Sequence, residues 1–192
     1  IIRHPIDRLV SHYIHEWTQK VISVEINQAI NQHHELIDYS CYSMQLKPYF
    51  ETFGRESVLP VFFERLLTNQ QDELERICRF IGYKGQPIWN RELDAQNVSS
   101  ERMRKSLWRD FLVEVPGLRV IRRTLIPKSW RTWIRGFWVM KQKPELELKQ
   151  IEYLKNVFDR DLSILSSWLG TSLCCENFKA EVQSQSLDWV DR

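Results

Sequence analysis

The fold of this chain is decided by its first seventeen residues, Ile1-Ile2-Arg3-His4-Pro5-Ile6-Asp7-Arg8-Leu9-Val10-Ser11-His12-Tyr13-Ile14-His15-Glu16-Trp17. The two isoleucines are typical of the end of a buried strand, and Arg3-His4 of the turn that leaves it. Pro5 suits the first position of a helix, where its missing N–H costs nothing. The apolar residues that follow recur at helical spacing: Ile6, Leu9, Val10, Tyr13, Ile14 and Trp17. The stretch therefore predicts a strand, a tight turn and a helix.

The turn between this strand and helix is a candidate anion site. A helix N-terminus presents unpaired N–H groups, and the Arg3 guanidinium can grip two phosphate oxygens at once. Ser11 lies two turns into the helix at the border of its apolar face, within reach of the same ligand. In the alternative interpretation, Arg3 pairs with a surface carboxylate and Ser11 faces water. Residue chemistry alone favours that alternative.

The string from Arg3 to Tyr13, Arg3-His-Pro-Ile-Asp-Arg8-Leu-Val-Ser11-His-Tyr13, shifts the balance. It resembles the 3'-phosphate-binding motif of the sulfotransferases that use 3'-phosphoadenylyl sulfate (PAPS). In that motif, an arginine and a serine eight residues later hold the 3'-phosphate of the co-substrate. The resemblance therefore implies that Arg3 and Ser11 bind PAPS. It assigns no catalytic residue and no metal.

Apolar spacing and stop signals predict further elements: a buried parallel strand at 58–63 and helices at 39–53, 72–81, 99–112 and 144–169. Two inward faces are predicted, one from Tyr39, Tyr42, Leu46, Tyr49, Phe50 and Phe53, and one from Leu74, Ile77, Cys78 and Ile81. The polar stretch 19–35 is either an extension of the first helix or a loop, with His33-His34-Glu35 on the surface. The strand that ends at Glu64, Arg79-Phe-Ile-Gly82 and the Pro-Glu-Leu start at Pro144 also resemble bacterial, heparan-sulfate-sulfotransferase-like members of the family.

The resemblance implies an α/β fold, the P-loop-like sulfotransferase fold with a parallel sheet, predominantly helical in this portion. The strand-loop-helix that wraps the 5'-phosphosulfate and the Glu or His base are not recognisable, and we expect both before Ile1. Residues 1–173 are predicted to form one sulfotransferase domain that is incomplete at its N-terminus. Residues 174–192 are predicted to be a polar, loosely held C-terminal tail.

Composition limits the partners. The 27 basic and 25 acidic residues give a net charge of +2, which indicates no nucleic acid. No apolar run approaches the roughly eighteen residues of a membrane span. The four cysteines, Cys41, Cys78, Cys174 and Cys175, show no zinc-ligand spacing, and we interpret them as reduced thiols of a cytoplasmic protein.

The segment 115–143 supports an alternative function. It contains arginines and lysines and no acidic residue, and Trp130, Trp133, Ile134, Phe137 and Trp138 share one helical face. Such a segment can lie on an anionic membrane or grip an acidic polymer, or it can be a covering helix with solvated arginines. The sequence thus predicts transfer of a sulfuryl group from PAPS to a hydroxyl or amine of a small molecule or carbohydrate. The alternative is a non-catalytic module that binds a polyanion or a membrane surface.

Overall fold

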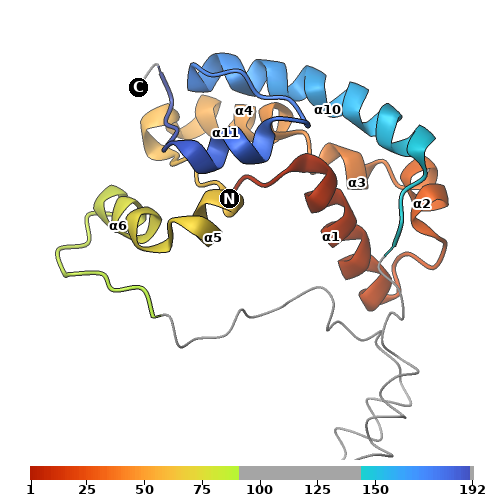
Figure 1. Cartoon of the computed structure of the whole chain (residues 1–192), viewed down its shortest axis with the longest axis horizontal. Coiled ribbons are helices and arrows are strands. Elements are labelled where there is room, and N and C mark those ends of the chain that lie inside the picture. The colour runs from red at the N-terminus through yellow and green to blue at the C-terminus, as the bar shows by residue number, and fades with distance from the viewer. Residues whose placement is uncertain (91–143, 191–192) are drawn as a thin grey trace, which may run out of the picture.

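The computed structural model describes residues 1–90 and 144–190 of the chain. Its helices there are α1 (Pro5–Gln19), α2 (Ile26–Gln32), α3 (Glu35–Asp38), α4 (Tyr42–Phe53), α5 (Phe63–Thr68), α6 (Gln70–Phe80), α10 (Leu148–Leu169) and α11 (Phe178–Ser184), with a 3-10 turn, η1, at Arg55–Ser57. Figure 1 shows α10 along one side of the molecule, above α1, while α5 and α6 lie at the opposite end from α2. The described part of the chain is therefore mostly helical, as predicted.

The predicted parallel sheet is reduced, within the described residues, to one parallel bridge between Ile2 and Phe62. The Ile2 N–H donates to the Val61 carbonyl at 2.7 Å, and the Phe63 N–H donates to the Ile2 carbonyl at 2.7 Å. The two segments predicted as parallel strands thus lie side by side in the predicted direction. They form no extended strand here, because Pro60 has no N–H to donate and α5 begins at Phe63.

The first helix forms as the opening stretch predicts. α1 begins at Pro5, with His4 as its N-cap, and ends at Gln19. Leu9, Tyr13 and Ile14 are buried, and they pack into the main hydrophobic cluster. The polar stretch 19–35 is mostly neither an extension of α1 nor a loop, because it contains the separate helix α2. This helix buries Ile26, Ala29 and Ile30 in the same hydrophobic cluster.

The last long helix supplies the centre of the core. α10 begins at Leu148, a little later than predicted, because Asn27 accepts from the Glu147 N–H and donates to the Glu145 carbonyl. Leu154, Phe158, Leu162 and Leu165 are fully buried along one face. The same face carries the buried Asp161, which accepts hydrogen bonds from the backbone N–H and the hydroxyl of Ser43 in the first turn of α4. An acceptor at a helix N-terminus satisfies N–H groups that have no partner within the helix, so α10 caps α4.

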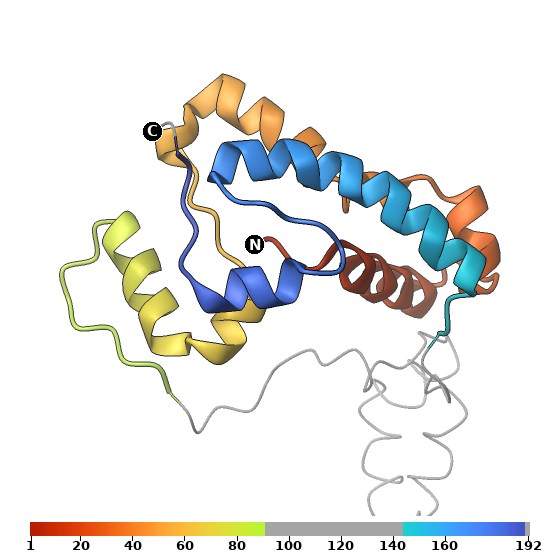
Figure 2. The same cartoon turned by 45° about the horizontal axis from the view of Figure 1, so that its top comes forward.

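The prediction of a loosely held tail is wrong for residues 174–190. Figure 2 shows α11 beside α5, and the segment buries Cys175, Phe178, Val182, Leu187 and Trp189. The Trp189 indole donates to the Val58 carbonyl at 2.7 Å. These apolar residues are dispersed among polar ones, so a short stretch of the sequence does not show that they are buried together. The domain limits at 173 and 174 stay a prediction.

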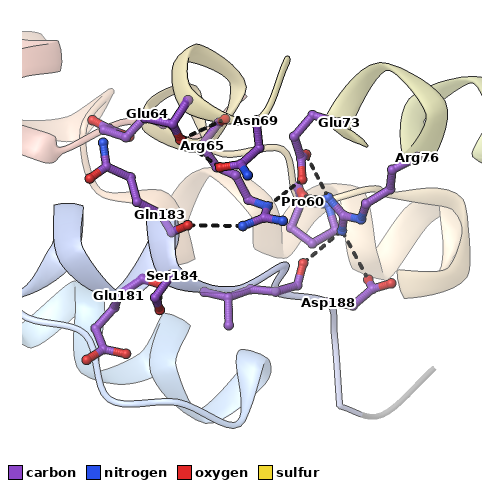
Figure 3. A network of polar contacts seen from close by, with 12 residues as sticks. Pro60, Glu64, Arg65, Asn69, Glu73, Arg76, Glu181, Gln183, Ser184 and Asp188 are labelled. Atoms are coloured by element: carbon purple, nitrogen blue, oxygen red, sulfur yellow. Dashed lines mark hydrogen bonds and ion pairs between the residues drawn. The ribbon is translucent and has the colours of Figure 1, made fainter. Parts of the chain in front are cut away.

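A C-terminal clamp of charged side chains fixes this segment to α5 and α6, as Figure 3 shows. Its centre is Glu73, whose side chain is 1% exposed and which pairs with Arg65 at 2.9 Å and with Arg76 at 3.2 Å. The two guanidiniums also donate to backbone carbonyls of Pro60, Gln183 and Leu187 at 2.8 to 3.1 Å. Both arginines are therefore largely neutralised by contacts that connect three segments of the chain.

Two predicted inward faces need correction. In the aromatic set of 39–53, Tyr42, Leu46 and Phe50 pack on the core, whereas Tyr39, Tyr49 and Phe53 are exposed. In α6 the buried residue is Glu73, and Ile81 is 68% exposed. The reason is that the most buried position of α6 is occupied by Glu73, which pairs with Arg65 of α5 and with Arg76 of α6 itself.

Candidate functional site

Side chains from two distant helices fix the turn that precedes α1. The Tyr42 hydroxyl accepts from the Arg3 N–H at 2.9 Å and donates to the Arg3 carbonyl at 2.7 Å. Glu64 accepts from the His4 N–H through Oε1 at 2.8 Å. Burial raises the pKa of Tyr42 well above its ordinary value, and the charges of Arg8 and Arg3 only partly oppose this, so the hydroxyl keeps its proton. The backbone of Arg3 is therefore held at both of its polar groups.

His4 closes the start of α1. Its Nδ1 accepts from the Asp7 N–H at 3.4 Å, and its Nε2 lies 2.9 Å from the Cys175 carbonyl. A neutral imidazole that accepts at one nitrogen donates at the other, so the proton is on Nε2. The ring thus connects the α1 N-terminus to the C-terminal segment.

Two N–H groups at the N-terminus of α1 already have partners. Pro5 has no N–H, the N–H groups of His4 and Asp7 have partners, and the Asp7 carboxylate adds a negative charge. Burial opposes ionisation of Asp7, but Lys179 at 2.6 Å outweighs it and holds the pKa of that carboxyl below its ordinary value. The N–H groups of His4 and Asp7 are therefore already occupied, and anion binding by the backbone at this terminus stays a prediction.

The Arg3 side chain is not neutralised by the part of the chain that the structure describes. Its guanidinium carbon lies 4.9 Å from the ring centroid of Phe63. Its Nε is buried and has no hydrogen-bond partner there, and no described carboxylate forms an ion pair with it. Arg3 thus differs from a surface arginine that pairs with a carboxylate.

Ser11 and Arg8 continue the site along α1. They lie three residues apart and so share one face of the helix, and both are half-buried. At about 1.5 Å per residue, Ser11 lies about 9 Å along the axis from Pro5, which is comparable to the combined reach of an arginine side chain and a phosphate. Arg8 lies close enough to Tyr42 and His12 for its charge to affect the pKa of both. Arg3 and Ser11 therefore belong to one turn-and-helix segment, with Arg8 between them in the sequence, and a ligand common to both stays a prediction.

Sequence reasoning missed the residues that support this turn. Tyr42 was expected in the core, Phe63 in a strand and Glu64 at the end of that strand. The signals that could have found them are a tyrosine hydroxyl on an apolar face and a glutamate directly after an apolar run, since both need buried partners.

Other predicted features lie outside the described residues. These are the helix at 99–112 and the basic aromatic segment 115–143. Within the described ranges, no group of three or more His, Cys, Asp or Glu residues could hold a metal ion. In the same ranges, no helix is both long and apolar enough to cross a membrane.

A guanidinium that has a fixed backbone and no anionic partner among the described residues, beside a helix that carries a half-buried serine, is the arrangement expected of a protein that binds an anionic ligand. The comparison with protein families identifies which class of protein this is. The family described as "Sulfotransferase domain" matches residues 1–166, and the chain belongs to that family. No curated protein and no solved structure matches the chain. The family assignment places the chain among transferase enzymes that move a sulfuryl group.

Proposed function

We propose that this protein transfers the sulfuryl group of PAPS to a hydroxyl or amine of a carbohydrate or other small acceptor, in the cytoplasm. Arg3 and Ser11 hold the 3'-phosphate of the donor. The observation that carries the proposal is the Arg3 side chain, which is partly buried and yet has no anionic partner within the described residues.

The chemistry of the 3'-phosphate suits this side chain. A buried N–H without an acceptor costs about 1 to 3 kcal/mol, and a phosphate oxygen at Nε would remove that cost. The guanidinium can present two parallel N–H groups to a phosphate, and the Ser11 hydroxyl can donate a further hydrogen bond. Arg3 and Ser11 therefore bind and orient the donor.

The transfer itself needs two further elements. One set of groups must stabilise charge on the bridging oxygen of the phosphosulfate, and a base must take the proton of the acceptor. We assign neither role to a described residue. The role of Arg3 and Ser11 in the reaction is to fix the donor so that its sulfuryl group has a defined position relative to the acceptor.

A thermal-shift titration of this chain with 3',5'-adenosine bisphosphate tests the proposal. A ligand that binds only the folded state raises Tm with concentration. We expect a shift with the bisphosphate and a much smaller one with 5'-AMP, which lacks the 3'-phosphate. Arg3→Ala should weaken bisphosphate binding at least tenfold, from the loss of about 1.5 to 3 kcal/mol of charge-assisted bonding.

The matched control is Arg55→Ala. Arg55 also stacks on aromatic rings, at 5.3 Å from Phe50 and 5.4 Å from Trp168, but it lies in η1 and those rings belong to α4 and α10. This variant should keep the affinity for the bisphosphate. An equal response to the bisphosphate and to 5'-AMP, or an unchanged affinity in Arg3→Ala, would contradict the assignment.

A further inference from the structure

Two consecutive residues at the start of α5 contact two consecutive residues of the turn. The Phe63 ring faces the Arg3 guanidinium at 4.9 Å, and the Glu64 carboxylate accepts from the His4 N–H at 2.8 Å. The parallel bridge between Ile2 and Phe62 sets this register, because it places residues 3 and 63 side by side. The contacts of Arg3 and His4 with α5 are thus consequences of one backbone pairing.

The pairing leaves a buried donor and a buried acceptor without partners among the described residues. The donor is Nε of Arg3, and the acceptor is Oε2 of Glu64, whose residue is only 6% exposed. Buried polar groups are normally satisfied, and opposite charges on adjacent segments would normally pair. Here the guanidinium lies against a ring instead. The arrangement holds the charge of Arg3 in place without neutralising it.

We propose that Phe63 is the positioning residue for the phosphate-anchoring Arg3, and that its ring keeps the guanidinium oriented toward the donor and away from the neighbouring Glu64 carboxylate. The proposal rests on the proposed function for its ligand. An aromatic face attracts a cation without donating or accepting a hydrogen bond, so all N–H groups of the guanidinium stay available to a phosphate. A carboxylate in the same place would occupy them.

The test is a double-mutant cycle on binding of 3',5'-adenosine bisphosphate, measured by calorimetry. Phe63→Leu should weaken binding about three- to fivefold, the size of a partly exposed cation–π contact. In an Arg3→Ala background the same substitution should have no further effect, because the residue that it positions is gone. Phe63→Tyr keeps the aromatic face and should restore the affinity. A merely structural role would give losses that add in the two backgrounds.

Phe50→Leu is the control for general damage to the packing. It removes the ring against which Arg55 stacks and should lower Tm while leaving the affinity for the bisphosphate unchanged. Additive losses in the cycle, or full affinity in Phe63→Leu, would overturn the proposal.

A second measurement needs no ligand, and so separates this inference from the proposed function. In protein labelled with 15N at arginine, the Hε resonance of Arg3 is assigned by its absence in Arg3→Ala. We expect the ring current of Phe63 to shift it upfield in the wild type and in Phe63→Tyr, and the shift to disappear in Phe63→Leu. An ordinary Hε shift in the wild type would overturn the positioning role. Absence of bisphosphate binding together with a shifted Hε would instead reject the proposed function.

Discussion

The turn site and the C-terminal clamp both include residues of α5, but the arginines of the two sites have opposite surroundings. In the clamp, Arg65 and Arg76 share the buried Glu73 and donate further to backbone carbonyls of neighbouring segments. In the turn site, made of Arg3, His4, Tyr42, Phe63 and Glu64, the backbone is fixed, but the guanidinium faces only a ring and its Nε has no partner in the described chain.

The contrast distinguishes an arginine that holds the fold together from one that is available to a ligand. Removing a charge from water is costly unless it is paired and hydrogen-bonded, and the clamp meets that condition with protein atoms alone. Within the described residues, the Arg3 guanidinium of the turn site has no such partner, although Glu64 supplies a buried carboxylate on the neighbouring segment. We therefore expect substitutions in the clamp to change mainly stability, and substitutions in the turn site to change mainly binding.

The largest effect is expected from Glu73→Ala in the clamp. The substitution leaves two partly buried guanidiniums without their common carboxylate, and breaking a buried ion pair by removing one partner costs about 3 to 5 kcal/mol. Urea unfolding followed by circular dichroism should show a loss of this order. Exposed Glu51→Ala in α4 is the control and should change the free energy of unfolding by less than about 0.5 kcal/mol. A loss no larger than that of the control would show that the clamp does not hold the fold.

The next effect separates the two kinds of arginine. Arg76→Ala removes donors to Pro60 and Leu187 and one partner of Glu73, and should lower the free energy of unfolding by about 2 to 3 kcal/mol. Arg3→Ala removes only a ring contact and a donor that has no described acceptor, so it should cost less than about 1 kcal/mol. Both are measured by urea unfolding without ligand. Equal losses would remove the distinction between the two regions.

Local sequence signals predicted the helix that carries the turn site better than the side chains that support the turn. α1 follows from Pro5 and the spacing of its apolar residues, because both act within a few positions of the chain. Residue chemistry made Arg3 and Ser11 one of two interpretations of the turn, the resemblance of their string to a family motif then favoured them, and their role stays a prediction. Their supports could not be predicted from local patterns, because Tyr42 and Glu64 contact the turn from 39 and 60 positions away.

The clamp was missed for a related reason. A glutamate within a charged helix is normally on the surface. Glu73 is buried because its ion pairs with Arg65 and Arg76 offset the cost of removing its charge from water. The buried residues of the C-terminal segment, such as Phe178 and Trp189, share a face only after the chain has folded back on α5 and η1. The burial of these residues therefore depends on contacts between segments far apart in the sequence, which local patterns do not predict.

A smaller effect is expected from Ser11→Ala, which tests the second residue of the proposed phosphate site. The hydroxyl has no hydrogen bond within the described residues, so its removal should leave the free energy of unfolding within about 0.5 kcal/mol of the wild type. One hydrogen bond to a phosphate is worth about 1 kcal/mol, so binding of 3',5'-adenosine bisphosphate should weaken about fivefold. Calorimetric titration measures this loss, and Ser167→Ala on α10, whose hydroxyl donates to the Ile164 carbonyl, is the control. Full affinity in Ser11→Ala would limit the site to Arg3.

The smallest effect concerns His12, which follows Ser11 in α1. Its Nδ1, like Nε of Arg3, is buried and has no hydrogen-bond partner among the described residues. Burial lowers the pKa of His12 below its ordinary value of 6.5, against the opposing charge of Glu16, whose carboxylate lies 3.5 Å from Nε2. Because the folded pKa is the lower one, the unfolded chain binds the proton more readily. The stability from neutral His12 is therefore complete above pH 6.5 and is lost as the pH falls from there through the folded pKa.

Urea unfolding at pH 7.5 and 5.5 should accordingly show a smaller difference between the two pH values in His12→Gln than in the wild type. The exposed His34 provides the matched control, and His34→Gln should keep the wild-type difference. An undiminished difference in His12→Gln would mean that protonation of this ring does not oppose folding.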